Sequence, residues 1–589
     1  MPFRSEITMK SPFPFAIRAA LIAFPALLCA CGGGSIGFAG AQPDTPLTIP
    51  PAEAPQAPAF TLTSVAIKTF RFAWTDVAGE TGYRLLEDPD GASGYTPVVT
   101  LPANATQHDL EVFLPTRVNA RYILQACNSG GCADSAAVSA SAPLTQAVGY
   151  VKAVNADEND RLGTHVALSA DGSTLAVGAV GESSQGADPA DNSLDQSGAV
   201  YVFTRSHGTW QQQARLKASH PDRYDNFGIS VALNANGDTL AVGAMLEDSQ
   251  GSDPLDNTGT GNGAAYVFTR NDGSWQQQAY LKAFNTDAND HFGISLALNA
   301  SGDTLAVGAE GESSQGADPH DNSHLASGAV YVYTRSGHTW QRQAFLKAAV
   351  PDLQDYFGYR VALSASGDTL AVGAWGDSGQ NDNLLFAGAT YVFTRSGDTW
   401  QQQAYLTASN ATARDRFGVS VALSANGDTL AVGAEDESSR SSDPLDNGGS
   451  SNGAVYVFTR SNGHWQQQAY LKATNTDPED LFGTSLALCG DGDTLAVGAR
   501  GESSNGSSPS DNSRRATGAT YVFKRSGSAW RQQAYVKAPN ADANDGFGAS
   551  VALSANGQTL AVGAAGEDGG GQSATADNSV LSAGAVYLY

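Results

Sequence analysis

The hydrophobic residues of this chain follow a long repeat. The clearest copy, residues 292–309, reads Phe-Gly, a short apolar run, a Ser-Gly-Asp turn and then Thr-Leu-Ala-Val-Gly-Ala. Copies begin at Leu162, Phe227, Phe292, Phe357, Phe417, Phe482 and Phe547, so successive starts differ by 65, 65, 65, 60, 65 and 65 residues. A period of this length predicts a propeller or a solenoid.

Each copy has the pattern of four short strands. In the second copy, residues 230–233 and 239–244 are apolar runs joined by an Asn-Gly turn at 236–237. Such a link predicts a tight hairpin in which both central residues have positive φ. After a loop of about twenty residues, a third strand such as 328–334 and a fourth such as 340–347 follow. Four antiparallel strands of this kind make one blade of a propeller.

The two ends of the repeat array complement each other. The last copy stops at its third strand, residues 585–589, while residues 146–153 resemble a fourth strand and precede the first copy. We therefore expect this N-terminal strand to complete the last blade, which closes the ring without an open sheet edge. The predicted fold is all-β: a seven-bladed β-propeller closed by an N-terminal strand and preceded by a small β-sandwich.

The repeated motif, Phe-Gly followed by Val-Gly-Ala, resembles the FG-GAP repeat of the integrin α-subunit β-propeller and its bacterial relatives. The resemblance covers roughly residues 146–589, with Leu162 in place of Phe in the first copy. It implies a propeller that mediates adhesion or recognition. In that family calcium often lies in the first hairpin of a blade, but here this loop is too short to surround an ion with six or more oxygens.

The N-terminus predicts export. Residues 1–30 carry Arg4, Lys10 and Arg18 and then an apolar run that is too short for a membrane-spanning helix, as in a secretory signal. Cys31 follows a small residue and precedes glycines, which resembles a bacterial lipobox and implies lipidation of Cys31. An ordinary secretory signal is the alternative. By the same resemblance, Gly32 implies a lipid-anchored protein of the outer membrane or cell surface.

Two further segments precede the propeller of residues 144–589. Residues 31–58 are rich in Gly and then in Pro, which predicts an extended tether. Residues 59–143 contain short strands and resemble a fibronectin type III sandwich with Trp74 and Tyr122 in its core. Cys127 and Cys132 are expected to form a disulfide in an exported protein, and half of a metal site is the alternative.

Charge narrows the choice of partner. The chain has 33 Lys and Arg against 59 Asp and Glu, a net charge of −26. Nucleic acid and bare anionic lipid are therefore not expected as partners, because binding to phosphate needs the opposite sign. Cations, basic protein surfaces and neutral glycans remain.

The position of the acids is more informative than their number. In antiparallel four-stranded blades the short turns share one face, and the long loops and the crossovers between blades share the other. Three acidic positions recur on the long-loop side. The first, in the crossover, is Asp160, Asp225, Asp290, Asp355, Asp415, Asp480 and Asp545. The second, after the second strand, is Glu182, Glu247, Glu312, Asp377, Glu437, Glu502 and Glu567. The third, before an Asn, is Asp191, Asp256, Asp321, Asp382, Asp446, Asp511 and Asp577.

Two interpretations of these acids stay open. If the three positions converge, each blade has a hard-cation site, for which Ca²⁺ is the candidate ion. Alternatively, the first Asp caps a turn and the Asp-Asn pair forms Asx turns.

We predict the function by comparing the residues that recur in every copy with those that depart from the repeat. A catalytic site uses residues in distinct roles and should interrupt the repeat, whereas these acids are the repeat itself. The fourth copy departs most, with Trp375 and Phe386 in a shortened loop that either contacts a ligand or folds onto its own blade. We predict a monomeric, non-catalytic propeller that binds a protein or glycan. A structural envelope protein and a glycan-active hydrolase or lyase are the alternatives.

Overall fold

The computed structural model describes residues 52–589 except 187, 189, 190, 207, 252, 317, 319, 380–382, 507 and 572–576. The predicted signal at 1–30, Cys31, most of the tether and Asp382 lie outside the described residues. Residues 52–589 form one compact unit. No helix within the described part of the chain has the length and apolarity that a membrane span requires.

The first part of this unit consists of two antiparallel sheets. One has the order β1 (Phe60–Ala66), β2 (Thr69–Trp74), β5 (Gln107–Glu111). The other has the order β4 (Thr96–Pro102), β3 (Gly82–Asp88), β6 (Arg121–Asn128), β7 (Gly131–Asp134), and β8 (Val138–Ser139) also pairs with β6. The short helices are η1 (Leu114–Arg117) and α1 (Ser141–Ala147).

Aromatic side chains fill the space between these two sheets. The ring of Trp74 lies 5.3 Å from that of Tyr83, and the ring of Phe72 lies 4.9 Å from that of Tyr122. The Tyr122 hydroxyl donates a hydrogen bond of 2.6 Å to the Glu87 carboxylate, which satisfies its polar end inside the core. Trp74 and Tyr122 are thus core residues, as predicted.

The repeats form four-stranded antiparallel sheets, each in chain order. Their first strands are β10 (Leu162–Leu168), β14 (Ser230–Leu233), β18 (Ser295–Leu298), β22 (Arg360–Leu363), β26 (Phe417–Leu423), β30 (Phe482–Leu488) and β34 (Ser550–Leu553). Their second strands are β11 (Thr174–Ala179), β15 (Thr239–Ala244), β19 (Thr304–Ala309), β23 (Thr369–Ala374), β27 (Thr429–Ala434), β31 (Thr494–Ala499) and β35 (Leu560–Ala564). Their third strands are β12 (Ala199–Ser206), β16 (Ala264–Asn271), β20 (Ala329–Ser336), β24 (Ala389–Ser396), β28 (Ala454–Ser461), β32 (Ala519–Ser526) and β36 (Ala585–Leu588). The fourth strands that follow in sequence are β13 (Thr209–Leu216), β17 (Ser274–Leu281), β21 (Thr339–Leu346), β25 (Thr399–Leu406), β29 (His464–Leu471) and β33 (Ala529–Val536).

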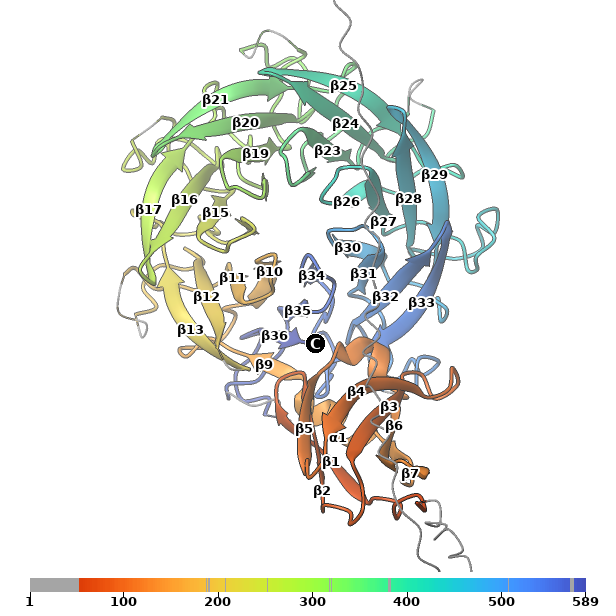
Figure 1. Ribbon diagram of the computed structural model, residues 1–589. Coiled ribbons are helices and arrows are strands. Elements are labelled where there is room, and N and C mark those ends of the chain that lie inside the picture. The colour runs from red at the N-terminus through yellow and green to blue at the C-terminus, as the bar shows by residue number, and fades with distance from the viewer. Residues whose placement is uncertain are drawn as a thin grey trace, which may run out of the picture. The chain divides into compact units, whose positions relative to one another are not determined.

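The sheet that begins with β34 takes its fourth strand from the other end of the array. Its order is β34-β35-β36-β9, where β9 (Gly149–Val151) pairs with β36 so that Tyr150 lies opposite Tyr587. The sheets are arranged around a ring (Figure 1).

The apolar core lies between neighbouring sheets. One cluster joins Val267 and Leu281 of the β14–β17 sheet to Phe292 and Val307 of the next. The contact is close enough to require glycine: a Cβ on Gly243 would lie 2.0 Å from the Gly293 carbonyl oxygen of the neighbouring sheet. The recurring Gly-Ala at the end of the second strand therefore serves to pack sheet against sheet.

The predicted two-residue hairpin turn is wrong. In the second repeat, Leu233 pairs with Leu240, residues 234–238 form the link, and Gly237 is the residue with positive φ in it. The reason is the side chain of Asn234, whose oxygen accepts hydrogen bonds of 3.0 Å from the N–H groups of Asp238 and Thr239. This side chain stabilises a wider turn than an Asn-Gly link alone.

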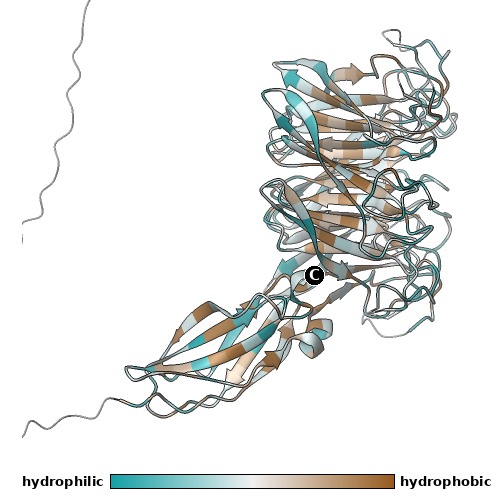
Figure 2. Cartoon of the chain, turned by 90° about the vertical axis from the view of Figure 1, so that its right-hand side faces the viewer, coloured by the Kyte–Doolittle hydropathy of each residue, from teal (hydrophilic) through white to brown (hydrophobic). Residues whose placement is uncertain are grey.

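The connections differ in length on the two sides of the ring. We call the side with the second-to-third-strand loops and the crossovers the long-loop face, and the opposite side the short-turn face. Figure 2 shows the long irregular connections gathered on one side of the sheets.

Candidate functional site

The recurring Glu after the second strand forms a buried ion pair with a Lys after the fourth strand. In one example, Lys347 Nζ lies 2.7 Å from Glu312 Oε2, and the two side chains are 7% and 1% exposed. The same contact, at 2.7–3.0 Å, occurs in six sheets: Lys152–Glu567, Lys217–Glu182, Lys282–Glu247, Lys347–Glu312, Lys472–Glu437 and Lys537–Glu502. The Glu residues of the second predicted position therefore join the long loop to the fourth strand.

Burial costs these pairs free energy, and additional hydrogen bonds offset that cost. Burial lowers the pKa of Lys347 and the neighbouring Glu312 carboxylate raises it again, with a net lowering. Lys347 Nζ also donates to the Ser327 hydroxyl at 2.8 Å. In the β14–β17 sheet the Tyr280 hydroxyl donates to Glu247 at 2.7 Å. The carboxylate is thus held by a cation and by neutral donors together.

The crossover Asp caps a turn in every repeat. Asp290 Oδ2 accepts a hydrogen bond of 2.9 Å from the N–H of Asp287, three residues earlier. The same contact, at 2.7–2.9 Å, is made by Asp160, Asp225, Asp290, Asp355, Asp415, Asp480 and Asp545. Burial raises the pKa of Asp290 to about 7, that of Asp225 to about 8 and that of Asp415 to about 6.

The Asp of the Asp-Asn pair is half-buried and forms an Asx turn. Asp191 accepts from the N–H groups of Gln185 and Ser193 at 3.1 Å. Hydrogen bonding by the Ser193 side chain, followed by that of these N–H groups, holds the pKa of Asp191 below the usual value. The following Asn192 donates to the crossover residue Asp157 at 3.3 Å. Asx-turn contacts with the N–H two residues on are also made by Asp256, Asp321, Asp446, Asp511 and Asp577.

These contacts are those of the turn-forming interpretation, with an ion pair added. Among residues that the structure describes, no group of three or more His, Cys, Asp or Glu side chains is arranged to hold a metal ion. Calcium binding stays a prediction. The sequence analysis missed the lysine partner, although Lys recurs 35 residues after Glu182, Glu247, Glu312, Glu437 and Glu502.

Trp375 and Phe386 lie together in the shortened loop of the β22–β25 sheet. The Trp375 ring is stacked on the Tyr356 ring at 4.4 Å and lies 5.8 Å from the Phe386 ring. The Arg416 guanidinium lies 5.1 Å from the centre of the Trp375 ring. The two partners outside the loop, Tyr356 and Arg416, belong to the crossovers before this sheet and before the next one, and contact of Trp375 and Phe386 with a ligand stays a prediction. Leu385, in the same loop, is 50% exposed.

A cavity of about 490 Å³ lies in this same sheet, where the repeated ion pair is interrupted. Its wall includes Asp377, which stands in the Glu position and accepts hydrogen bonds from the hydroxyls of Tyr391 at 2.7 Å and Tyr405 at 2.8 Å. Gly379 N–H donates to it at 2.8 Å. The position of the lysine is occupied by Thr407.

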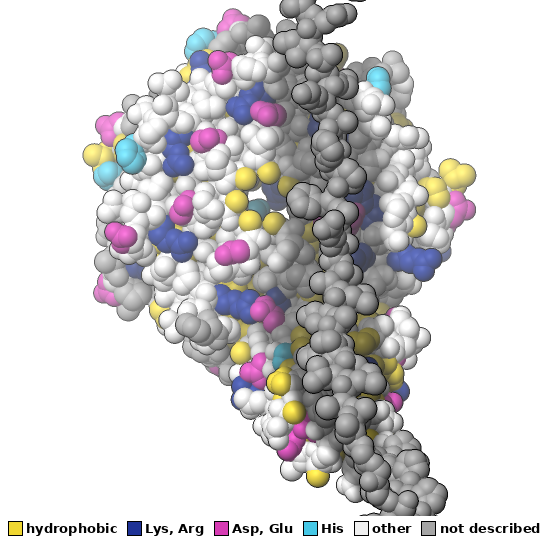
Figure 3. Space-filling model, in the orientation of Figure 1, with side chains coloured by type: hydrophobic (Ala, Val, Ile, Leu, Met, Phe, Trp, Pro, Cys, Tyr) yellow, Lys and Arg dark blue, Asp and Glu magenta, His cyan; other side chains and the backbone are white. Residues whose placement is uncertain are grey.

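The short-turn face carries ion pairs of a different kind. Arg460 lies 2.8 Å from Asp428, and the Asp side chain is 47% exposed. The Arg460 guanidinium also lies over the Trp465 ring, whose Nε1–H donates to Gln403 of the neighbouring sheet at 2.9 Å. Basic and acidic side chains lie next to one another at several places around the ring in Figure 3.

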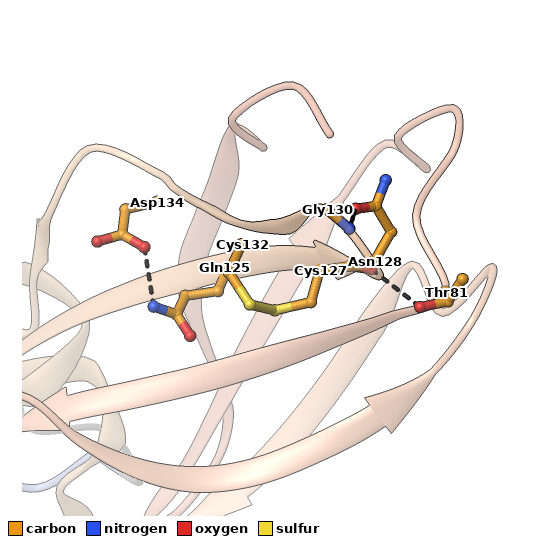
Figure 4. The surroundings of a disulfide bond; sticks show 7 residues. All are labelled: Thr81, Gln125, Cys127, Asn128, Gly130, Cys132 and Asp134. Atoms are coloured by element: carbon orange, nitrogen blue, oxygen red, sulfur yellow. Dashed lines mark hydrogen bonds between the residues drawn. A yellow bond between two sulfur atoms is a disulfide. The ribbon is translucent and has the colours of Figure 1, made fainter. Parts of the chain in front are cut away.

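The part of the chain that the structure describes contains three cysteines, two in a disulfide and one as a buried thiol. Cys127 and Cys132 face each other on paired strands β6 and β7 and are joined by a disulfide (Figure 4). Cys489 is a buried thiol that donates to Asp491 at 2.7 Å, and burial raises its pKa. A raised pKa disfavours the thiolate that nucleophilic chemistry needs.

The ring of repeated four-stranded sheets and the buried contacts that recur in it define a propeller-like repeat protein. The family model for the FG-GAP repeat matches residues 210–268, 275–333, 340–393, 400–458, 465–523 and 530–589, more than half of the chain. The chain belongs to the FG-GAP repeat family.

Other comparisons are more distant. No curated protein matches the chain. The structure of Pseudomonas aeruginosa periplasmic gluconolactonase, PpgL, is 16% identical, with a TM-score of 0.38 and coverage of 65% of this chain and 90% of that one. The WD40 repeats of RRP9 are 10% identical, with a TM-score of 0.42 and coverage of 75% and 96%. These likenesses are too weak to bear on function.

Proposed function

We propose that this protein is a non-catalytic binding or adhesion propeller that recognises a protein or a glycan through its long-loop face. The propeller has seven blades, and β9 closes it as the fourth strand of the last. Residues 59–143 are a fibronectin type III-like spacer, and a lipid on Cys31 holds the protein at the outer membrane or cell surface.

The distribution of exposed apolar side chains supports this proposal most directly. In the described part of the propeller, the large apolar residues that are exposed lie in the long loops and crossovers: Val154, Tyr224, Leu255, Phe284, Leu325, Val350, Leu353, Leu384, Leu385, Leu445 and Leu581. Leu445 is 82% exposed and Leu255 is 69% exposed. Covering an exposed apolar side chain with a partner is favourable, and the position of all these side chains on one side of the ring favours that face as the binding surface.

The recurring acids of the same face hold the loops in place and are not the residues that we expect to contact a ligand. Glu312, Asp290 and their equivalents other than Asp377 are buried in ion pairs and turn caps, so they build the loops. Recognition is left to the exposed side chains that vary between repeats, such as Leu255, Leu445 and the hydroxyls and amides around them.

A glycan and envelope-protein array tests the proposal when product formation is followed by mass spectrometry. We expect the full chain to bind a restricted set of ligands without converting them. Leu255→Asp combined with Leu445→Asp should weaken binding and leave the melting temperature unchanged. Val65→Asp, on the exposed surface of β1, is the matched control. Turnover of a glycan would favour the hydrolase or lyase, and the absence of any ligand would favour the structural role.

A further inference from the structure

The β22–β25 sheet lacks a cation that six other sheets supply from their own chain. In those six, a lysine ammonium lies 2.7–3.0 Å from the buried Glu carboxylate. Here the residue after β25 is Thr407, and the carboxylate belongs to Asp377. Tyr405 contacts Asp377 as Tyr280 contacts Glu247. Since alternate residues of a strand share a face, Thr407 occupies the place of the lysine.

Three replacements in this repeat open the cavity. Thr407 is shorter than Lys, and Asp377 is one methylene shorter than Glu. Val350 is equivalent in sequence to Asn285 of the preceding repeat. There, the Asn285 side chain accepts a hydrogen bond of 2.7 Å from the Tyr331 hydroxyl. Tyr391, the equivalent of Tyr331, donates to Asp377 instead. Val350 and Asp377 both line the cavity of about 490 Å³, which is large enough for an extended alkyl chain.

The charge of the cavity wall is negative. Asp352, Asp355 and Asp377 line it, and none of its described lining residues is Lys, Arg or His. Asp377 is 5% exposed, and the hydrogen bonds described for it come from neutral donors. A buried carboxylate is favourable when a cation pairs with it. In six equivalent places of the same chain, that cation is a primary ammonium on an alkyl chain.

We propose that this cavity binds the primary alkylammonium group of a ligand, either a free amine or a lysine side chain, with Asp377 as its ion-pair partner. Tyr391 and Tyr405 position the carboxylate, and Val350 contacts the alkyl chain. The site lies on the long-loop face. It names a ligand chemistry for the proposed binding role and rests on that role.

Titration of the full chain with n-butylammonium, followed by calorimetry, tests the site. We expect saturable binding, and no binding of n-butanol, which has the same chain length without the charge. Thr407→Lys should place an internal ammonium in the cavity and weaken n-butylammonium binding at least about tenfold. Thr407→Val, which adds no cation, should leave the affinity unchanged. Asp377→Asn keeps the hydrogen-bond acceptor and should abolish binding.

Several results would overturn the inference. Equal binding by the Thr407→Lys variant would place the amine elsewhere. Binding of n-butanol at the affinity of n-butylammonium would show that the site recognises the alkyl chain and not the ammonium group. Lack of n-butylammonium binding by a chain that still binds its array ligand removes this site and leaves the proposed function standing. Nα-acetyl-lysine amide distinguishes the sources: tighter binding than n-butylammonium indicates a lysine side chain, and equal binding indicates a free amine.

Discussion

The two faces of the propeller use the same charges in opposite environments. On the long-loop face, Glu312 and Lys347 are buried and each satisfies the other. On the short-turn face, Asp428 pairs with Arg460 at nearly the same distance but is half exposed to water. Water already solvates exposed ions, so an exposed pair adds little stability, whereas a buried ion that loses its partner is strongly destabilising. The contribution of each ion pair to stability therefore depends on its burial and not on its distance alone.

Removal of one member of a buried pair should have the largest effect. We expect Glu312→Gln to lower the free energy of unfolding by about 3–5 kcal/mol, because Lys347 would stay buried without its counter-ion. The measurement is denaturant unfolding at neutral pH. The double variant Glu312→Leu/Lys347→Met should lose less than the single one.

The single variant Glu312→Gln also distinguishes a role of Glu312 in the ion pair from a role as a calcium ligand. If Glu312 acts through Lys347, the loss should be equal in EDTA and in millimolar calcium. A loss that appears with calcium and disappears in EDTA would show instead that Glu312 is a calcium ligand.

A smaller effect is expected from pH at the buried turn caps. The pKa of Asp290 is about 7 in the folded protein, above its ordinary value of 3.8, so the folded state holds this proton more tightly than the unfolded state. Its contribution to stability is complete below about pH 4 and is lost as pH rises through 7. Relative to Asp290→Asn, the unmodified protein should lose about 2 kcal/mol between pH 5 and pH 7. Parallel curves for the two proteins would contradict this assignment.

The smallest effect should come from the exposed pair. Asp428→Asn is expected to change the free energy of unfolding by about 0–1 kcal/mol, and less in high salt, because solvent screens both charges. Unfolding at low and high ionic strength measures it. If Asp428→Asn lowered the free energy of unfolding as much as Glu312→Gln, the two faces would not differ in the way that we describe.

Much of the architecture could be predicted from the sequence because it depends on local patterns. Alternating apolar runs predicted the all-β, four-stranded sheets, and the repeated Phe-Gly and Val-Gly-Ala predicted the family. The turn at 234–238 was missed because a side-chain cap by Asn234 competes with the backbone preference of Asn-Gly.

The candidate site was harder to predict because its contacts join distant residues. Glu312 and Lys347 meet only after β20 and β21 have paired, and their spacing in sequence carries no local signal. The cavity beside Asp377 depends on three replacements at once, at Val350, Asp377 and Thr407. None of these replacements predicts a cavity by itself. Together they leave space beside a buried carboxylate that has no lysine at the equivalent position.

The pairing of β9 with β36 also has a kinetic consequence. Val151 lies opposite Val586, so this sheet is completed only when β36 has been made. Until then β9 has no partner strand, and contacts between residues so far apart in sequence form slowly. Synthesis that stops before β36 leaves the edges of β9 and β35 unpaired and prone to aggregation. The chain is therefore most prone to aggregation in the interval before β36 has been made.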